Sequence, residues 1–113
     1  MQTFPFELEY YVADSGQMPF KEWLDGLKDI SAKAKIRVRL DRVRMGNLGD
    51  SRAIGGSMYE LKVEHGPGYR IYFAREDDRI ILLLLGGDKS HQAKDIAKAR
   101  VFRDDYRRRR KHG

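Results

Sequence analysis

The chain has 113 residues, of which 41% are hydrophobic and 35% charged, and its formal net charge is +6. This length fits one compact domain, and the composition excludes a chain that is disordered throughout. The absence of cysteine excludes a disulfide scaffold and thiol catalysis, and the three histidines do not have the spacing of zinc ligands.

The N-terminal part of the chain predicts one strand followed by a short helix. From Phe4 to Val12, apolar residues alternate with the period of a half-buried strand. Pro19 then occupies a position that suits the first turn of a helix. Apolar residues follow it at helical spacing: Phe20, Trp23, Leu24 and Leu27. We expect Trp23 to anchor the core.

The segment from Ser31 to Met45 fits two interpretations. Apolar and basic residues alternate from Ala34 to Leu40, which is compatible with a strand. A continuous apolar stripe at helical spacing favours a helix instead. The stripe consists of Ala32, Ile36, Leu40 and Val43. We therefore predict a helix that is capped by Ser31 and stops at Gly46 and Asn47.

The middle of the chain predicts a loop followed by three strands. Residues 46–57 contain four glycines and have the composition of a loop. Strands are predicted over Tyr59–Glu64, Tyr69–Ala74 and Ile80–Leu85, and the short turns between them favour an antiparallel meander. The last strand is apolar throughout, which is typical of a central strand covered on both faces.

The C-terminal part predicts a third helix and a tail. The helix begins at Asp88 or Ser90, and residues 107–113, which include no apolar side chain, predict a disordered basic tail. The fold class is therefore α+β, with an N-terminal strand, two helices, a three-stranded antiparallel meander that completes a small sheet, and a C-terminal helix. We expect a single domain over residues 1–106.

The positive charge is concentrated in two segments. Residues 31–45 hold six basic side chains and one acidic one, and residues 100–113 hold seven and two. This asymmetry favours a polyanionic partner, and nucleic acid before membrane, because no amphipathic stretch pairs Trp or Phe with the basic face. A solvated helix face and a frayed tail explain the charge equally well, so the charge alone leaves both interpretations open.

The first hairpin of the meander can be given a register, because all its residues have to agree on which face is buried. A loop over Glu64–Gly68 places Lys62 opposite Arg70 and Glu60 opposite Tyr72. The predicted core face then consists of Tyr59, Leu61, Val63, Tyr69, Ile71 and Phe73.

The opposite face of this hairpin has two interpretations. One is a surface ladder of salt bridges, formed by Glu60, Lys62, Glu64 and Arg70. The other is a concave polar face that holds a phosphate between Lys62 and Arg70, with Tyr72 nearby. A lysine point charge and an arginine fork together suit a developing phosphorane.

The start of the third helix adds Lys89, His91 and Lys94, at a place where free N–H groups and the helix dipole attract phosphate. If the protein is an enzyme, its chemistry uses Lys, Arg, Tyr and His without a metal or another cofactor. The N-terminus lacks the features of a signal peptide, and no apolar run is long enough to span a membrane. We therefore expect a cytoplasmic protein with no membrane partner.

The segments Tyr59–Val63, Gly68–Phe73 and Leu85–Ser90, in this order of elements, resemble the RelE/ParE superfamily of type II toxin–antitoxin toxins. The resemblance is strongest to the HigB-like addiction-module killer proteins and extends over roughly residues 4–103. It implies a small toxin that is neutralised by an antitoxin encoded beside it, and we expect that antitoxin to be a small helix-turn-helix protein. Many members of the superfamily cleave mRNA in the ribosomal A site.

The resemblance also implies the roles of several residues. Lys62 matches a lysine on the second strand of the family, Arg70 matches the arginine of its Gly-Tyr-Arg segment, and Lys89 matches a basic residue after the last strand. We expect Arg70 to stabilise the phosphorane, Lys62 to act on the same charge or on the ribose 2′-OH, and His91 to act as an acid or base. The expected RNA-binding residues are Lys89, Lys94 and Tyr72.

The favoured function is a metal-independent, ribosome-dependent mRNA endonuclease (an mRNA interferase) that inhibits translation, with the ribosome and mRNA as partners. The alternative is a non-enzymatic toxin of the ParE type, which inhibits DNA gyrase by binding. A third option is a plain RNA-binding module that uses the basic tail. That option has a weakness, since no exposed aromatic residues are interleaved with the basic runs.

Overall fold

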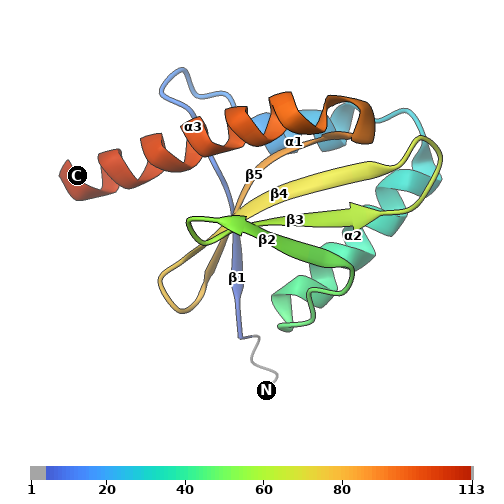
Figure 1. Cartoon of the computed structure of the whole chain (residues 1–113), viewed down its shortest axis with the longest axis horizontal. Coiled ribbons are helices and arrows are strands. Elements are labelled where there is room, and N and C mark those ends of the chain that lie inside the picture. Colours follow the sequence, from blue (N-terminus) through green and yellow to red (C-terminus); the bar gives the residue numbers. More distant parts are fainter. Residues whose placement is uncertain (1–4, 113) are drawn as a thin grey trace.

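The computed structural model describes residues 5–112, which form one five-stranded sheet in the order β1-β5-β4-β3-β2 (Figure 1). Its strands are β1 (Glu7–Tyr10), β2 (Ser51–Gly55), β3 (Met58–Val63), β4 (Tyr69–Glu76) and β5 (Ile80–Asp88). β1 runs parallel to β5, and every other neighbouring pair is antiparallel. Phe4, where the predicted first strand begins, lies outside the described residues. The predicted α+β class and order of elements are confirmed.

Two helices, α1 (Pro19–Gly26) and α2 (Ile30–Arg44), cover one face of the sheet. Pro19 begins α1, as predicted. Trp23 packs so closely on β5 that a Cβ atom at Gly86 would lie 2.2 Å from its indole ring. Glycine at this position therefore lets the tryptophan lie directly against the strand backbone, which places α1 over β5.

The ambiguous basic segment forms the predicted helix, and its apolar stripe is buried in the core below α1 and α2. The predicted cap is wrong, because Asp29 rather than Ser31 precedes the first helical residue. The Asp29 carboxylate accepts a hydrogen bond from the backbone N–H of Ala32 at 3.2 Å. A carboxylate at this position satisfies one of the free N–H groups and also suits the helix dipole.

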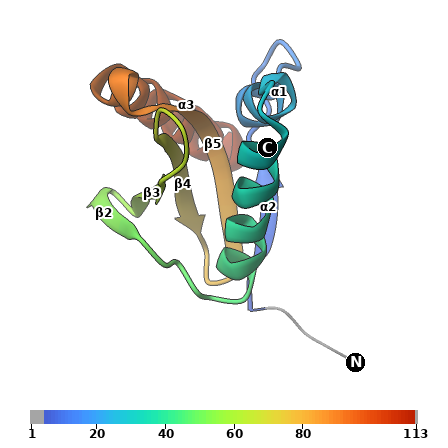
Figure 2. The same ribbon diagram turned by 90° about the vertical axis from the view of Figure 1, so that its right-hand side faces the viewer.

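A short 3₁₀ turn, η1 (Lys89–His91), leads from β5 into α3 (Gln92–His112), which lies across the other face of the sheet. Figure 2 shows α3 on one side of the sheet and α1 and α2 on the other. The side chains buried beneath α3 form a second core cluster, which includes Tyr11, Tyr72, Leu82, Leu84 and Ala99. β5 is consequently covered on both faces, as its apolar sequence predicted.

The predicted register of the first hairpin is confirmed, because Lys62 pairs with Arg70 and Glu60 pairs with Tyr72. The predicted core face is also confirmed: Tyr59, Leu61, Val63, Tyr69, Ile71 and Phe73 all pack in the cluster under α1 and α2.

The prediction of a loop over residues 46–57 is wrong for its second half, where β2 forms. Arg52 pairs with Glu60, and the ladder is interrupted between Ala53 and Gly55. β2 is an edge strand of five residues that ends in Gly55, and its pairing depends on β3 rather than on any apolar alternation of its own.

The prediction of a disordered tail is wrong for residues 107–112, which continue α3 to His112. Carboxylates at the end of β4, in the turn that follows it and on α3 itself bind the arginines of this segment. Arg107 pairs with Glu76 at 2.9 Å, Arg109 with Asp105 at 2.8 Å, and Arg110 with Asp77 at 3.3 Å. Basic residues near a helix C-terminus are also favoured by the helix dipole.

These ion pairs predict unequal effects of two neighbouring substitutions. The Glu76 side chain is 9% exposed and depends on Arg107, whereas the Arg108 side chain is 66% exposed. Arg107→Ala should lower the free energy of unfolding by about 1–3 kcal/mol, because it leaves a buried carboxylate without its partner. Arg108→Ala should cost about 0–1 kcal/mol. Urea denaturation of both variants measures the difference, and equal effects would contradict an ordered C-terminal turn.

Candidate functional site

The polar residues of the β3–β4 hairpin lie on the face of the sheet that α3 covers. Lys62 lies opposite Arg70, which in turn lies opposite Gly87 of β5. Glu60 lies opposite Tyr72, which is fully buried in the cluster beneath α3. Since residues two apart on a strand point to the same side, all four side chains of the hairpin share this face.

Three of the predicted basic residues come together at the end of this hairpin, where β5 turns into η1. The backbone N–H of Lys89 donates to the carbonyl of Gly68 at 3.0 Å. A Cβ atom at Gly68 would lie 3.3 Å from Cδ of Lys89 and 3.8 Å from Nη1 of Arg70, so both side chains converge there. Lys62, which is half-buried, is the cross-strand partner of Arg70. We refer to Lys62, Arg70 and Lys89 as the basic cluster.

His91 and Lys94 lie nearby at the surface. Oδ1 of Asp88 accepts a hydrogen bond from the Ser90 backbone N–H at 2.9 Å and lies 3.1 Å from Nδ1 of His91. Hydrogen bonds from Ser90 and His91 hold the pKa of Asp88 below its ordinary value. The His91 side chain is 62% exposed, and Lys94 is also exposed. No hydrogen bond or ion pair among the described residues joins either of them to Arg70.

Glu60 is a fully buried carboxylate that joins three elements. It accepts hydrogen bonds from Nε of Arg52 on β2 at 2.9 Å and from Nε2 of Gln92 on α3 at 2.7 Å. Burial by itself raises the pKa of Glu60, but these hydrogen bonds and the charges of Arg52 and Arg70 outweigh it and lower the pKa below its ordinary value. The alternative of a solvated salt-bridge ladder is not found, because Glu60 and Arg70 are both buried.

Two buried donors beside Glu60 have no hydrogen-bond partner within residues 5–112: Nε of Arg70 and the hydroxyl of Tyr72. Arg70, only 8% exposed, donates from Nη1 to the carbonyl of Tyr69 at 3.2 Å. Burial raises the pKa of Tyr72, and the charges of Glu60 and Asp95 raise it further, so the hydroxyl keeps its proton. Both groups can therefore donate to an anionic oxygen.

Sequence reasoning missed Arg52, Gln92 and Asp95, which surround the hairpin from β2 and α3. A Cβ atom at Gly87 would lie 2.2 Å from Oδ2 of Asp95, so this carboxylate rests against the strand backbone. Burial raises the pKa of Asp95. A glycine inside a strand marks such close approaches, and the Gly86–Gly87 pair was therefore a usable indication that both faces of β5 receive large neighbours there.

Within the described part of the chain, no group of three or more His, Asp or Glu side chains is placed to hold a metal ion. None of the helices in residues 5–112 combines the length and the apolar composition needed to cross a membrane.

The fold and the site define a small α+β protein with a basic cluster at the end of a central hairpin. Residues 22–104 match the family described as phage-derived Gp49-like proteins (DUF891). An uncharacterized protein of Haemophilus influenzae is 41% identical over 85 residues, which cover 75% of this chain and 86% of that relative. The chain belongs to the Gp49-like family, a family of addiction-module toxins related to RelE and ParE.

The buried Glu60 predicts a specific dependence of stability on pH. Because its pKa is lower in the folded than in the unfolded chain, its contribution is complete above its ordinary pKa and is lost as the pH falls through the lowered value. Glu60→Gln should lower the free energy of unfolding at neutral pH by about 1–3 kcal/mol. It should also make the loss of stability between about pH 6 and pH 3 shallower than in the unmodified protein.

Denaturant titrations across this pH range provide the measurement. Glu64→Gln, at an exposed position just after β3, is the matched control and should change stability at neutral pH by no more than about 0.5 kcal/mol. Identical pH profiles for Glu60→Gln and the unmodified protein would show that the carboxylate is not held in its charged form by its neighbours.

Proposed function

We propose that this protein is the toxin of a type II toxin–antitoxin module and acts as a metal-independent, ribosome-dependent mRNA endonuclease that inhibits translation. Membership in the Gp49-like family supports the toxin class. The observation that supports the cleavage activity is that Lys62, Arg70 and Lys89 lie together at the hairpin end. Nε of Arg70 and the nearby Tyr72 hydroxyl are buried donors that have no partner among residues 5–112. The expected partners are an antitoxin, the ribosome and mRNA.

The chemistry needs no group beyond the side chains of this chain. Attack of a ribose 2′-OH on the adjacent phosphate forms a cyclic phosphate and releases a 5′-OH, and it requires a base, an acid and stabilisation of the phosphorane charge. In the proposal Arg70 stabilises that charge, Lys62 acts on the same charge or on the 2′-OH, and His91 transfers a proton. The residues proposed to position RNA are Lys89, Lys94 and Tyr72.

The burial of Arg70 restricts how a phosphate approaches. Arg70 is 8% exposed, and its Nη1 lies near Gly68 at the hairpin end. Lys62 and Lys89 flank that end and are more accessible than Arg70. The proposed route therefore leads from the hairpin end between the two lysines, and Tyr72, which is fully buried, acts from beneath the phosphate by its hydroxyl.

One observation favours a second candidate function, a non-enzymatic toxin that inhibits DNA gyrase by binding. Tyr72 and Arg70 are buried, which limits their access to an RNA substrate. Inhibition by binding does not require these two side chains to be exposed. In this alternative the cluster around Glu60 stabilises the layer formed by α3, and the partner binds elsewhere.

Growth and cleavage tests distinguish these functions. Induced expression should arrest growth, and co-expression of the small protein encoded beside this chain should relieve the arrest. Addition of the purified protein to ribosomes programmed with mRNA should yield cleavage that primer extension detects. Normal growth despite soluble expression would contradict a toxin, and arrested growth without cleavage would favour gyrase inhibition.

Substitution of Arg70 tests the proposed site directly. Arg70→Ala should reduce cleavage by about 10²- to 10³-fold, the scale for loss of one donor to a transition state. Arg70→Lys should restore it only in part, because an ammonium group lacks the bidentate fork. Lys62→Ala should act in the same direction, and the double variant should lose less than the product of the single losses if both groups bind one phosphate.

The control for lost positive charge is Arg79→Ala, at an exposed position in the β4–β5 turn. Thermal melts of each variant establish that it folds, which matters because Arg70 is buried. Full cleavage by a folded Arg70→Ala protein would refute the assigned site.

A further inference from the structure

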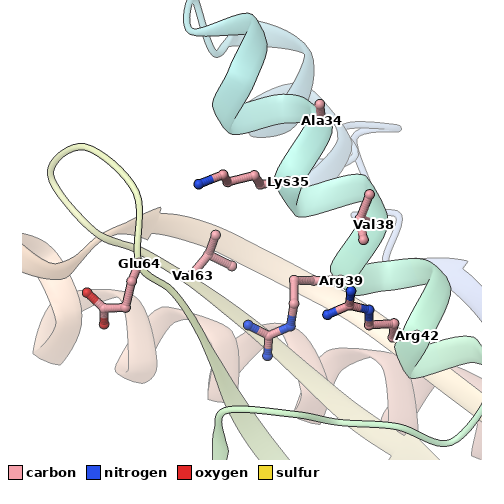
Figure 3. A pocket seen from close by; sticks show the side chains of 7 residues that line it. All are labelled: Ala34, Lys35, Val38, Arg39, Arg42, Val63 and Glu64. Carbon is pink, nitrogen blue, oxygen red and sulfur yellow. The ribbon is translucent and has the colours of Figure 1, made fainter.

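A groove outside the basic cluster runs between α2 and the end of β3. It has a volume of about 380 Å³. Its lining residues are Ala34, Lys35, Val38, Arg39, Arg42, Val63 and Glu64. Figure 3 shows the side chains of Lys35, Arg39 and Arg42 projecting from α2 toward the space beside Val63 and Glu64. None of these residues belongs to the basic cluster.

The floor of the groove is aliphatic. Ala34 and Val38 lie one helical turn apart on α2, next to the stripe that faces the core, and Val38 is 48% exposed. Val63 closes the floor from β3 and is 4% exposed. An exposed valine on a helix rich in arginine and lysine contributes nothing to the core, which already contains the buried stripe of α2.

The rim of the groove is positively charged. Lys35, Arg39 and Arg42 follow one another at spacings of four and three residues, so they line one side of α2. Arg39 is held in place by donating to the backbone carbonyls of Lys62 at 2.5 Å and of Leu48 at 3.0 Å. Glu64 is the one carboxylate among the seven lining residues, which leaves an excess of positive charge around an apolar floor.

We propose that this groove binds an acidic amphipathic segment of a partner protein. An aliphatic side chain of the partner packs on Val38 and Val63, and carboxylates on either side of it pair with Lys35 and Arg42. A helix with apolar residues at every third or fourth position and acidic neighbours presents this pattern. The proposal concerns a surface separate from the basic cluster and does not depend on the proposed cleavage activity.

The lining residues favour a peptide over a nucleic acid. The phosphates of a nucleic acid would bind the positively charged rim and leave the aliphatic floor unused, and single-stranded bases bind by stacking on aromatic rings. The seven lining residues include no aromatic ring. An aliphatic floor contributes to binding only when the ligand brings apolar side chains of its own.

A peptide titration tests the proposal with the full-length protein. The probe is a synthetic helical peptide in which leucines recur every third or fourth residue among glutamates. Its binding should shift the amide NMR signals of Ala34, Val38 and Val63, and should weaken as salt is added. Peptides with serine in place of leucine, or lysine in place of glutamate, should bind at least about tenfold more weakly, which corresponds to about 1.4 kcal/mol.

Substitutions in the chain provide the matching controls. The affinity for the acidic peptide should fall by about tenfold or more in each of three variants: Val38→Glu, Lys35→Glu and Arg42→Glu. Arg37→Glu makes the same change of charge on α2 outside the groove and should leave the affinity within about twofold. The proposal is overturned if the peptide shifts amide signals of residues outside the groove, or if the lysine peptide binds equally well. It is also overturned if a single-stranded oligoribonucleotide binds the groove more tightly than the acidic peptide does.

Discussion

A strand that is apolar on both faces has to be covered twice, and β5 imposes this requirement on the whole chain. Ile81 and Leu83 face the cluster under α1 and α2, whereas Leu82 and Leu84 face the cluster under α3. β1 and β4 pair with the two edges of β5. Burial of this one strand therefore determines that the helices divide between two layers and that the C-terminal helix returns across the sheet.

The layer formed by α3 changes character along its length, and this change positions the candidate site. Its first turn contacts polar groups, because Gln92 binds Glu60 and Asp95 rests on Gly87. Its later turns pack apolar side chains such as Ala99 and Phe102. A buried charge is tolerated only with partners, so the polar end requires the network around Glu60. Arg70 lies on the same face as this network, and its Nη1 lies near Gly68 at the hairpin end.

Patterns within single segments were sufficient to predict the helices, every strand except β2, and the register of the central hairpin, because alternation along β3 and β4 specifies which side chains share a face. They were insufficient where the partner lies far along the chain. Glu60 accepts a hydrogen bond from Gln92, which is 32 residues away, and Arg107 donates to Glu76, which is 31 residues away. The local sequence predicts that such charged residues are exposed to solvent, because their partners become neighbours only in the tertiary structure. For the same reason, the depth at which Arg70 lies could not be read from its neighbours in sequence.

The parallel pairing of β1 with β5 has a consequence for how the chain folds during synthesis. Glu7 lies opposite Ile80, so the first strand to leave the ribosome pairs with the last strand to be made. Contacts this distant in sequence close late, because the loop entropy has to be overcome first. A nascent chain that ends before β5 can form α2 and the β3–β4 hairpin locally, but its apolar surfaces stay uncovered. The chain therefore acquires its complete sheet, and with it the layer over Arg70, only when nearly the whole sequence has emerged.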